Sequence, residues 1–319
     1  MRIGQNPEKK KFNKIEYKQH RVIIPVYIPD SHDQYFNNLF SVLKISIDSL
    51  LKTTNKTQTN ITIINNNCKK EVTNYLDSLL QDKIIDKHVK LSTNYGKVYT
   101  ILSEAKASYE QLITIADADV FYFSNWLSNT IQVFNNYKKA GVVAPLPMPQ
   151  SAYYCNHSLF FDKLLKVKKG KVVLDEDILL FEKSVNSKIS IEKNNWFKNQ
   201  LYLEKNRSKT CVGAGHFIAT YRKEVLDKIN VEKPKYIFEN GAETFHLDNP
   251  IDKLGYYRLS TIKTFAYHLG NNIPNWVKEY KFSELNLTEN SNKIKFSNSF
   301  IPYKIKEITA KIYRKLTTI

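Results

Sequence analysis

The sequence has few cysteines, no long apolar segment and no arginine-rich stretch, and each absence excludes a class of protein. Three cysteines, Cys68, Cys155 and Cys211, are widely spaced in 319 residues. An odd number at such spacing suits neither a disulfide framework nor a zinc site, so we expect a protein of the reducing cytosol. No apolar run approaches the roughly 20 residues that span a bilayer. The lysine-rich residues 1–18 contain no apolar segment that could serve as a secretory signal.

The most conspicuous property of the composition is its positive charge. Lysine and arginine number 48 and aspartate and glutamate 31, which gives a formal net charge of +17 at pH 7. This favours an anionic partner, such as nucleic acid, a membrane surface or a phosphorylated substrate. The same lysine excess also accompanies many Asn, Ile, Tyr and Phe residues, as expected of A+T-rich codons. Because the lysines are scattered and no aromatic-interleaved basic run occurs, we do not expect nucleic acid as the partner.

The first 120 residues alternate between apolar, β-type runs and segments of helical periodicity. This alternation predicts a doubly wound, mostly parallel α/β sheet with crossover helices on both faces. In such sheets ligands bind beyond the carboxyl ends of the strands, where Pro25, Asn67, Asn94 and Asp117 fall. The predicted strands are residues 21–28, 61–64, 89–92 and 112–120, and the predicted helices are residues 35–51, 71–80 and 98–108.

Downstream the pattern is less regular. Residues 123–139 are predicted to form a further helix and residues 140–147 a strand with its exit. Residues 148–209 mix aromatic side chains with lysine-rich turns, and we interpret them as an insertion on the acceptor side of the site. A helix is predicted at residues 222–229, after a glycine-containing turn.

A pair of aspartates lies at the end of the most apolar predicted strand. Asp117 and Asp119 come directly after the run 112–116, and side chains in an extended segment alternate, so both carboxylates can point the same way. Two converging carboxylates suit a hard divalent cation such as Mg²⁺, which fills its other positions with water and substrate phosphates. A second Asp-x-Asp, Asp175 to Asp177, leads into an apolar run and is better explained by acidic residues in the first turn of a helix.

With these elements in this order, the sequence resembles the GT-A fold of nucleotide-sugar-dependent glycosyltransferases, especially the inverting family 2 type. The resemblance covers roughly residues 20–275. Asp117-Ala118-Asp119 matches the Asp-x-Asp of that family, which binds metal and the donor diphosphate. The other matching segments are residues 22–27 as the opening strand, 61–67 as the second strand, 94–97 as the Asn-x-Gly-Lys turn, 213–225 as a glycine turn with strand and helix, and 266–271 as the late His-x-Gly segment.

The resemblance implies a metal-dependent reaction with Mn²⁺ or Mg²⁺. Glu243 lies closest to the position of the catalytic carboxylate, and Asp248 is the second candidate for the general base. The family commonly has Glu-Asp there, whereas this chain has Glu243-Thr244, so the base and the inverting outcome stay open. The metal ligands implied are Asp117, Asp119 and His268, and the donor-binding residues are Pro25, Tyr27, Asn66, Asn67, Asn94, Lys97 and Asp117.

The tail combines an apolar stripe with basic residues. Ile301, Ile305, Ile308, Ile312 and Leu316 follow helical spacing, and several lysines and an arginine flank them. A basic amphipathic helix of this kind can lie on an anionic membrane surface. Packing of the same stripe on the domain or on a partner is the alternative.

We therefore expect a basic leader (residues 1–19), one GT-A domain (20–285, with the insertion 148–209) and a helical tail (286–319). The expected activity is sugar transfer from a nucleotide-sugar donor to a carbohydrate or lipid-linked acceptor, in bacterial surface polysaccharide assembly. The expected location is cytoplasmic, peripheral on the inner face of the membrane. A nucleotidyltransferase would require a glycine-rich basic loop after the first strand, which residues 27–31 lack. A non-catalytic protein that binds nucleic acid or anionic glycan is the other alternative.

Overall fold

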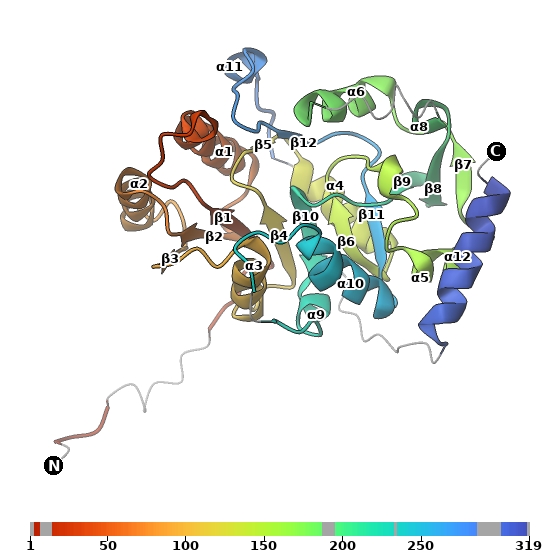
Figure 1. Ribbon diagram of the computed structural model, residues 1–319, viewed down its shortest axis with the longest axis horizontal. Coiled ribbons are helices and arrows are strands. Elements are labelled where there is room, and N and C mark those ends of the chain that lie inside the picture. Colours follow the sequence, from red (N-terminus) through yellow and green to blue (C-terminus); the bar gives the residue numbers. More distant parts are fainter. Residues whose placement is uncertain (1–2, 7–14, 187–194, 233–234, 286–300, 318–319) are drawn as a thin grey trace.

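The structure is a computed structural model that describes residues 3–6, 15–186, 195–232, 235–285 and 301–317. Its centre is one ten-stranded sheet, in the order β3-β2-β1-β4-β10-β6-β11-β9-β8-β7, and a small sheet of β5 and β12 lies beside it (Figure 1). The strands are β1 (His20–Val26), β2 (Thr59–Asn66), β3 (Lys87–Leu91), β4 (Leu112–Ala116), β5 (Val120–Tyr122), β6 (Ala140–Ala144), β7 (Lys168–Gly170), β8 (Gln200–Lys205), β9 (Ser208–Val212), β10 (Ile218–Arg222), β11 (Tyr257–Ser260) and β12 (Ala266–His268).

Most strands of the large sheet run in one direction. β2 and β4 each pair with β1, and β3 pairs with β2; all of these pairs are parallel. β11 is parallel to β6. β10 lies between β4 and β6 and is antiparallel to both, so β4 and β6 share a direction. β7, β8 and β9 pair antiparallel with their neighbours and extend the sheet beyond β11. The mostly parallel α/β fold predicted from the sequence is thus confirmed.

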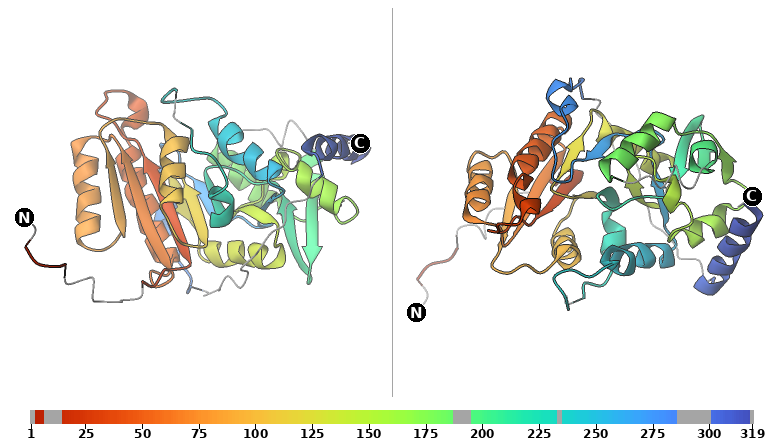
Figure 2. Two further views of the ribbon diagram at one scale, coloured as in Figure 1. Left: turned by 90° about the horizontal axis from the view of Figure 1, so that it is seen from below. Right: turned by 45° about the horizontal axis from the view of Figure 1, so that its top comes forward.

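Helices cover both faces of the parallel part. The views of Figures 1 and 2 show α1 and α2 on one side of β1 and β2 and α3 on the other. Right-handed crossovers require this arrangement, because the chain first moves outward to β3 and then returns across β1 to β4. The α-helices are α1 (Leu39–Thr53), α2 (Lys70–Gln81), α3 (Lys97–Lys106), α4 (Trp126–Asn136), α5 (His157–Lys163), α6 (Asp175–Ser184), α8 (Asn195–Lys198), α9 (Lys223–Leu226), α10 (Asn249–Lys253), α11 (Trp276–Glu279) and α12 (Tyr303–Thr317).

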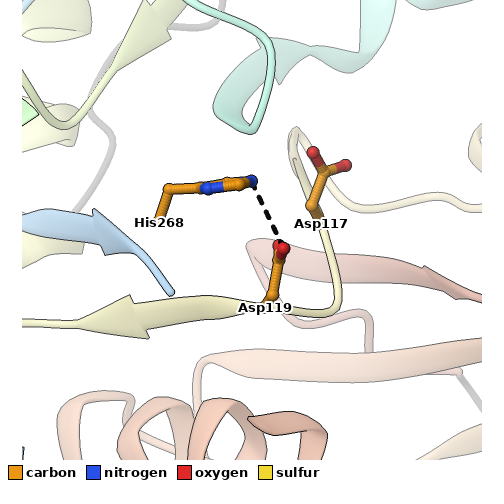
Figure 3. A group of neighbouring side chains, drawn as sticks. All are labelled: Asp117, Asp119 and His268. Carbon is orange, nitrogen blue, oxygen red and sulfur yellow. Dashed lines mark ion pairs between the residues drawn. The ribbon is translucent and has the colours of Figure 1, made fainter. Parts of the chain in front are cut away.

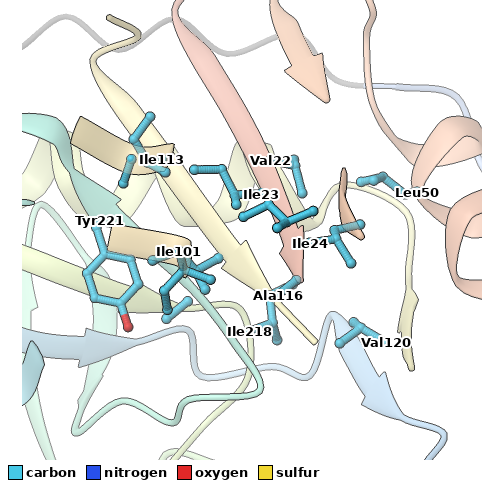
Figure 4. Close-up of a cluster of buried hydrophobic side chains, with 14 of the residues drawn as sticks. Val22, Ile23, Ile24, Leu50, Ile101, Ile113, Ala116, Val120, Ile218 and Tyr221 are labelled. Atoms are coloured by element: carbon cyan, nitrogen blue, oxygen red, sulfur yellow. The ribbon is translucent and has the colours of Figure 1, made fainter. Parts of the chain in front are cut away.

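The main hydrophobic core lies between these helices and β1, β2 and β4. Val22, Ile23 and Ile24 of β1 are fully buried, since the strand is covered on both faces and carries apolar side chains at successive positions. Figure 4 shows these three side chains together with Ile113 and Ala116 of β4 and Leu50 of α1. The core therefore fixes the carboxyl ends of β1 and β4, from which the predicted site residues extend.

Three expectations about local structure were wrong. The helix predicted at residues 222–229 is present only as the short α9, because Arg222 is the last residue of β10 and the chain enters a turn after Leu226. The predicted helix at 35–51 begins as an α-helix only at Leu39, after a 3₁₀ turn at Gln34–Phe36. β4 ends at Ala116, so Asp117 and Asp119 lie in the turn to β5 rather than in extended backbone.

Residues 148–209 contain α5, α6, α8, β7, β8 and the first two residues of β9. Their second Asp-x-Asp lies in the first turn of α6, as predicted, and Asp177 Oδ1 accepts a hydrogen bond of 2.7 Å from the backbone N–H of Thr264. Asp175 pairs at 3.0 Å with Lys171 on the surface. Asp175 and Asp177 therefore have structural partners at the start of α6. Within the described residues no helix is both long and apolar enough to cross a membrane.

Candidate functional site

Three potential metal ligands meet where β4 ends. Asp117 and Asp119 follow Ala116, and the next residues form β5, which pairs antiparallel with β12 so that His268 is opposite Val120. The backbone N–H of Leu269 donates to the carbonyl of Asp119 at 2.7 Å and continues this register. The strand pairing therefore brings His268 beside Asp119, although the two residues are far apart in the sequence.

The geometry of this group fits a divalent cation. One ligand atom from each of Asp117, Asp119 and His268 lies within 4.8 Å of the others, and His268 Nε2 is 3.3 Å from Asp119 Oδ2 (Figure 3). Asp119 Oδ1 and His268 Nδ1 are buried and have no hydrogen-bond partner among the described residues. Burial raises the pKa of Asp119 to about 6, and the electrostatic interaction with His268 acts in the opposite direction. Buried carboxylates of this kind are stabilised by pairing or by a metal.

An aromatic cluster holds the two-stranded sheet that carries His268. Phe121 of β5 packs edge-on against Trp276 of α11 with ring centroids 5.3 Å apart, and against Tyr280 at 5.4 Å. Tyr267 of β12 contacts the same Trp276 at 5.1 Å. Edge-to-face contacts of this kind restrict the rings to a narrow set of orientations. They fix β12, and hence His268, against the Asp117–Asp119 turn.

Lys97 lies in the same site as a cation. It is the first residue of α3, and its Nζ is 2.5 Å from Asp117 Oδ1 and 3.3 Å from Glu243 Oε1. Burial opposes the charged form, but the two carboxylates outweigh it and raise the pKa of Lys97. Lys97 is thus not a solvated turn lysine: it joins the carboxylate after β4 to the segment that contains Glu243.

The turn that presents Lys97 is held by two asparagines. The Asn66 side-chain amide donates to Asn94 Oδ1 at 2.7 Å and to the Gly96 carbonyl at 3.2 Å, and its oxygen accepts from the Tyr95 N–H at 3.0 Å. Asn94 Oδ1 also accepts from the Gly96 N–H at 2.9 Å. Gly96 has φ 76°, and a Cβ there would lie 2.6 Å from the carbonyl of Ile237, so only glycine fits. Asn66 and Asn94 therefore position Lys97, and their direct contact with a ligand stays a prediction.

The remaining predicted donor residues lie at the ends of β1 and β2. Tyr27 directly follows β1 and is 43% exposed, and Asn67 directly follows β2, is exposed and has φ 67°. Pro25 is half-buried inside β1, in register with Ile64. Because β1 and β2 are adjacent and parallel, Tyr27 and Asn67 leave the sheet at the same edge as Asp117. An aromatic ring and an amide there can stack on and hydrogen-bond a planar base.

Glu243 and Asp248, the two candidates for the general base, have different surroundings. Glu243 precedes a π-helical turn, Thr244–Asp248, and faces Lys97, which lowers the pKa of Glu243 despite its partial burial. Asp248, at the end of that turn, points into the protein, where Arg258 Nη1 and His216 Nε2 lie 3.0 and 3.1 Å from its Oδ2. Burial raises the pKa of Asp248 to about 7. The structure thus brings Glu243 together with Lys97 and Asp117 and places Asp248 behind them.

Arg258 is a residue that the sequence analysis missed. It lies in β11, its side chain is 1% exposed, and its Nη2 donates to the carbonyl of Ala214 at 2.6 Å. The signal that could have revealed it is an arginine inside the apolar strand Tyr257–Ser260, since a buried guanidinium needs partners. Arg258 links β11 to Asp248 and to the glycine turn that precedes β10.

We expect Arg258→Leu to lower the free energy of unfolding by about 3–5 kcal/mol, because it leaves the Asp248 carboxylate buried without its cation. Chemical denaturation followed by circular dichroism measures this. The matched control is Lys52→Leu, which breaks the exposed Lys52–Asp48 pair of 2.7 Å and should change stability by about 1 kcal/mol or less. Equal losses in the two variants would show that the buried pair is not important for stability.

A pocket opens beside Lys97. Its volume is about 190 Å³, and Glu243 and Lys97 line it together with the first turns of α3. Tyr236 and Phe238, which are 67% and 83% exposed, line it from the segment after residue 234. This run of aromatic residues also escaped the sequence analysis. The pocket therefore joins a carboxylate of lowered pKa to an exposed aromatic surface.

The sequence model described as Glycosyl transferase family 2 matches residues 22–229. A comparison with curated protein sequences finds no match. Among solved structures, residues 1–349 of TarS from S. aureus align with 78% of this chain at 13% identity and a TM-score of 0.45. The mannosyltransferase PcManGT from Pyrobaculum calidifontis, in complex with GDP-Man and Mn²⁺, aligns with 77% at 10% identity and a TM-score of 0.44. The chain spans 60% and 55% of the lengths of these two structures.

Proposed function

Because the chain belongs to glycosyl transferase family 2, we propose that it transfers a sugar from a nucleotide-sugar donor to a carbohydrate or lipid-linked acceptor in a metal-dependent reaction. The observation that carries this proposal is the meeting of Asp117, Asp119, His268, Lys97 and Glu243 at the carboxyl end of β4. Glycosyl transfer needs a stabilised leaving diphosphate, an activated acceptor hydroxyl and exclusion of water at one point. Each requirement corresponds to a part of this group.

The residues that would hold the cation are Asp117, Asp119 and His268, because one possible ligand atom of each lies within 4.8 Å of the others. A bound Mn²⁺ or Mg²⁺ would supply positive charge to the departing diphosphate. Lys97 adds a second positive charge at the same place. Its Nζ pairs with Asp117 Oδ1 and Glu243 Oε1, so the ammonium group lies beside the proposed metal ligands.

We assign the general base to Glu243. Its lowered pKa keeps the carboxylate ionised at neutral pH, so that it can accept the proton of an acceptor hydroxyl. The same side chain lines the pocket beside Tyr236 and Phe238, which we propose as the acceptor subsite. Flat aromatic faces suit the apolar faces of a sugar ring, and a single base on the acceptor side is what an inverting displacement requires.

We propose that Tyr27 and Asn67 contact the nucleoside of the donor. Both extend from the sheet edge at which Asp117 lies, and both are exposed. As the setting of the reaction we propose bacterial surface polysaccharide assembly on the inner face of the membrane. Family membership and the surface helix α12 support that setting.

Thermal denaturation with UDP, GDP, dTDP and CMP, each with and without Mn²⁺, tests the donor site. A ligand at 100 times its dissociation constant should stabilise the protein by about 2.7 kcal/mol, which gives a clear rise in Tm. We expect one nucleotide to raise Tm only with metal, and we expect the rise to vanish in Asp119→Asn and to persist in Asp175→Asn. Asp175 belongs to the other Asp-x-Asp, at the start of α6, and is the matched control. No rise with any nucleotide would overturn the proposal.

A further inference from the structure

Helix α12 packs on the domain through its more polar face. Tyr303 OH donates to Asp252 Oδ2 at 2.7 Å, and Lys306 Nζ donates to Ser158 Oγ of α5 at 3.3 Å. Ala310 is buried, and the ring of Tyr313 lies 5.2 Å from that of Phe160. Near the end of the helix, Thr317 Oγ1 is 2.6 Å from Tyr153 OH. These contacts anchor α12 along the outer side of α5, where Figure 1 shows it at the edge of the molecule.

The apolar stripe of α12 lies on the opposite face. Ile305, Ile308 and Ile312 are 47%, 57% and 53% exposed, and Leu316 is 71% exposed. Successive residues of a helix are rotated by about 100°, so these four share one side, turned away from Lys306 and Ala310. None of them belongs to a hydrophobic cluster of the described residues. The alternative that this stripe packs on the domain is therefore not what the structure shows, because the helix packs with its other face.

Basic side chains border the exposed stripe along one edge. Lys304, Lys311 and Lys315 are exposed and lie at the helical positions next to Ile308 and Ile312. Glu307 is the single acidic residue of α12. A surface with aliphatic side chains at its centre and ammonium groups at its border matches the two layers of an anionic membrane, namely acyl chains and lipid phosphates.

We propose that the exposed face of α12, formed by Ile305, Ile308, Ile312 and Leu316 with the lysine edge, docks on an anionic lipid bilayer. Because the other face is anchored to α5, the helix can insert its aliphatic side chains while it stays attached to the domain. Charge favours lipid over a second copy of the chain, since contact between two such faces would bring two lysine edges together. The inference does not depend on the transferase reaction, because binding occurs without donor or acceptor.

Cosedimentation of the full chain with vesicles tests this proposal. We expect binding to vesicles of 70% phosphatidylcholine and 30% phosphatidylglycerol, weak binding to pure phosphatidylcholine, and weaker binding in 0.5 M NaCl through screening. Ile308→Gln/Ile312→Gln should lower the partition coefficient by at least about tenfold, since it removes the centre of the apolar face. Lys304→Gln/Lys311→Gln/Lys315→Gln should lower it only for the anionic vesicles.

The matched control is Leu80→Gln/Leu179→Gln, which removes two exposed leucines from α2 and α6 and should leave binding unchanged. A Tm equal to that of the wild type shows that each variant is folded. Absence of binding to anionic vesicles would overturn the proposal. A dimer in analytical ultracentrifugation that dissociates in Ile308→Gln/Ile312→Gln, with no vesicle binding, would assign the face to a second copy instead. The proposal would also be overturned if Leu80→Gln/Leu179→Gln lost as much vesicle binding as Ile308→Gln/Ile312→Gln.

Discussion

Asp119→Asn is expected to lower kcat by at least about 10²–10³-fold, because it removes a charged ligand where charge must be stabilised on the leaving group. The substitution keeps the shape of the side chain, and its neighbours Leu269 and His268 keep their backbone positions through the β5–β12 pairing. Initial rates of sugar transfer or of nucleotide release measure the loss. The nucleotide- and metal-dependent rise in Tm should disappear in the same variant, which gives a readout that does not require turnover.

Two controls make this result specific. Asp175→Asn changes the other Asp-x-Asp, which starts α6 and pairs with Lys171, and should retain full activity. The Tm of Asp119→Asn without ligand should not fall, because burial already disfavours the charged form of this carboxyl and the substitution relieves that cost. An Asp119→Asn enzyme with normal kcat and a normal metal-dependent shift would exclude this carboxylate from the reaction.

Glu243→Gln is expected to lower kcat by about 10²–10⁴-fold, since an amide cannot accept the proton of the acceptor hydroxyl. Donor binding should persist, because the metal ligands and the residues at the ends of β1 and β2 are unchanged. Steady-state kinetics with varied donor, together with the thermal shift by nucleotide, separates the two effects. Glu71→Gln is the control and should retain full activity: Glu71 lies in the first turn of α2, is exposed and pairs at 3.2 Å with Lys69.

Asp248→Asn distinguishes the two candidates for the base. Asp248 is buried against Arg258, so its replacement should cost stability on the order of 3 kcal/mol and leave most of kcat in the folded fraction. Glu243→Gln should show the reverse: its free energy of unfolding should equal that of the wild type, and its turnover should be lost. If Asp248→Asn abolished turnover at unchanged stability while Glu243→Gln stayed active, the assignment would pass to Asp248.

The fold was largely predictable from local pattern. β1, β2 and β4 are buried at successive positions because both of their faces are covered, and each contains an apolar run; the intervening helices have clear 3.6-residue periodicity. β10 was not predictable in this way, since a strand that returns antiparallel into a parallel sheet has the same local signature as any other buried strand. The apolar segment Ile218–Arg222 indicated burial but not its neighbours.

The candidate site was predictable in part, through the order of its motifs. Asp117, Asp119, Lys97, Glu243 and His268 were each identified from a segment, and the structure brings the five together. The supporting residues were less visible. The donor contact predicted for Asn66 stays a prediction, and the sequence did not reveal that its amide holds the turn before Lys97. Arg258 escaped notice because its importance comes only from the carboxylate that it meets across the fold.

The sequence by itself determined the α/β class, the family and the residues that carry the chemistry, because periodicity and motif spacing act over a few residues at a time. Only the tertiary structure decided which of these residues meet. The antiparallel register of β5 and β12 places His268 at Asp119, and the π-helical turn directs Glu243 outward to Lys97 and Asp248 inward to Arg258. The same holds for α12: its sequence specifies an amphipathic helix, but packing against α5 decided that the isoleucines face outward. Contacts between elements distant in sequence depend on how whole surfaces fit, and no single segment encodes that fit.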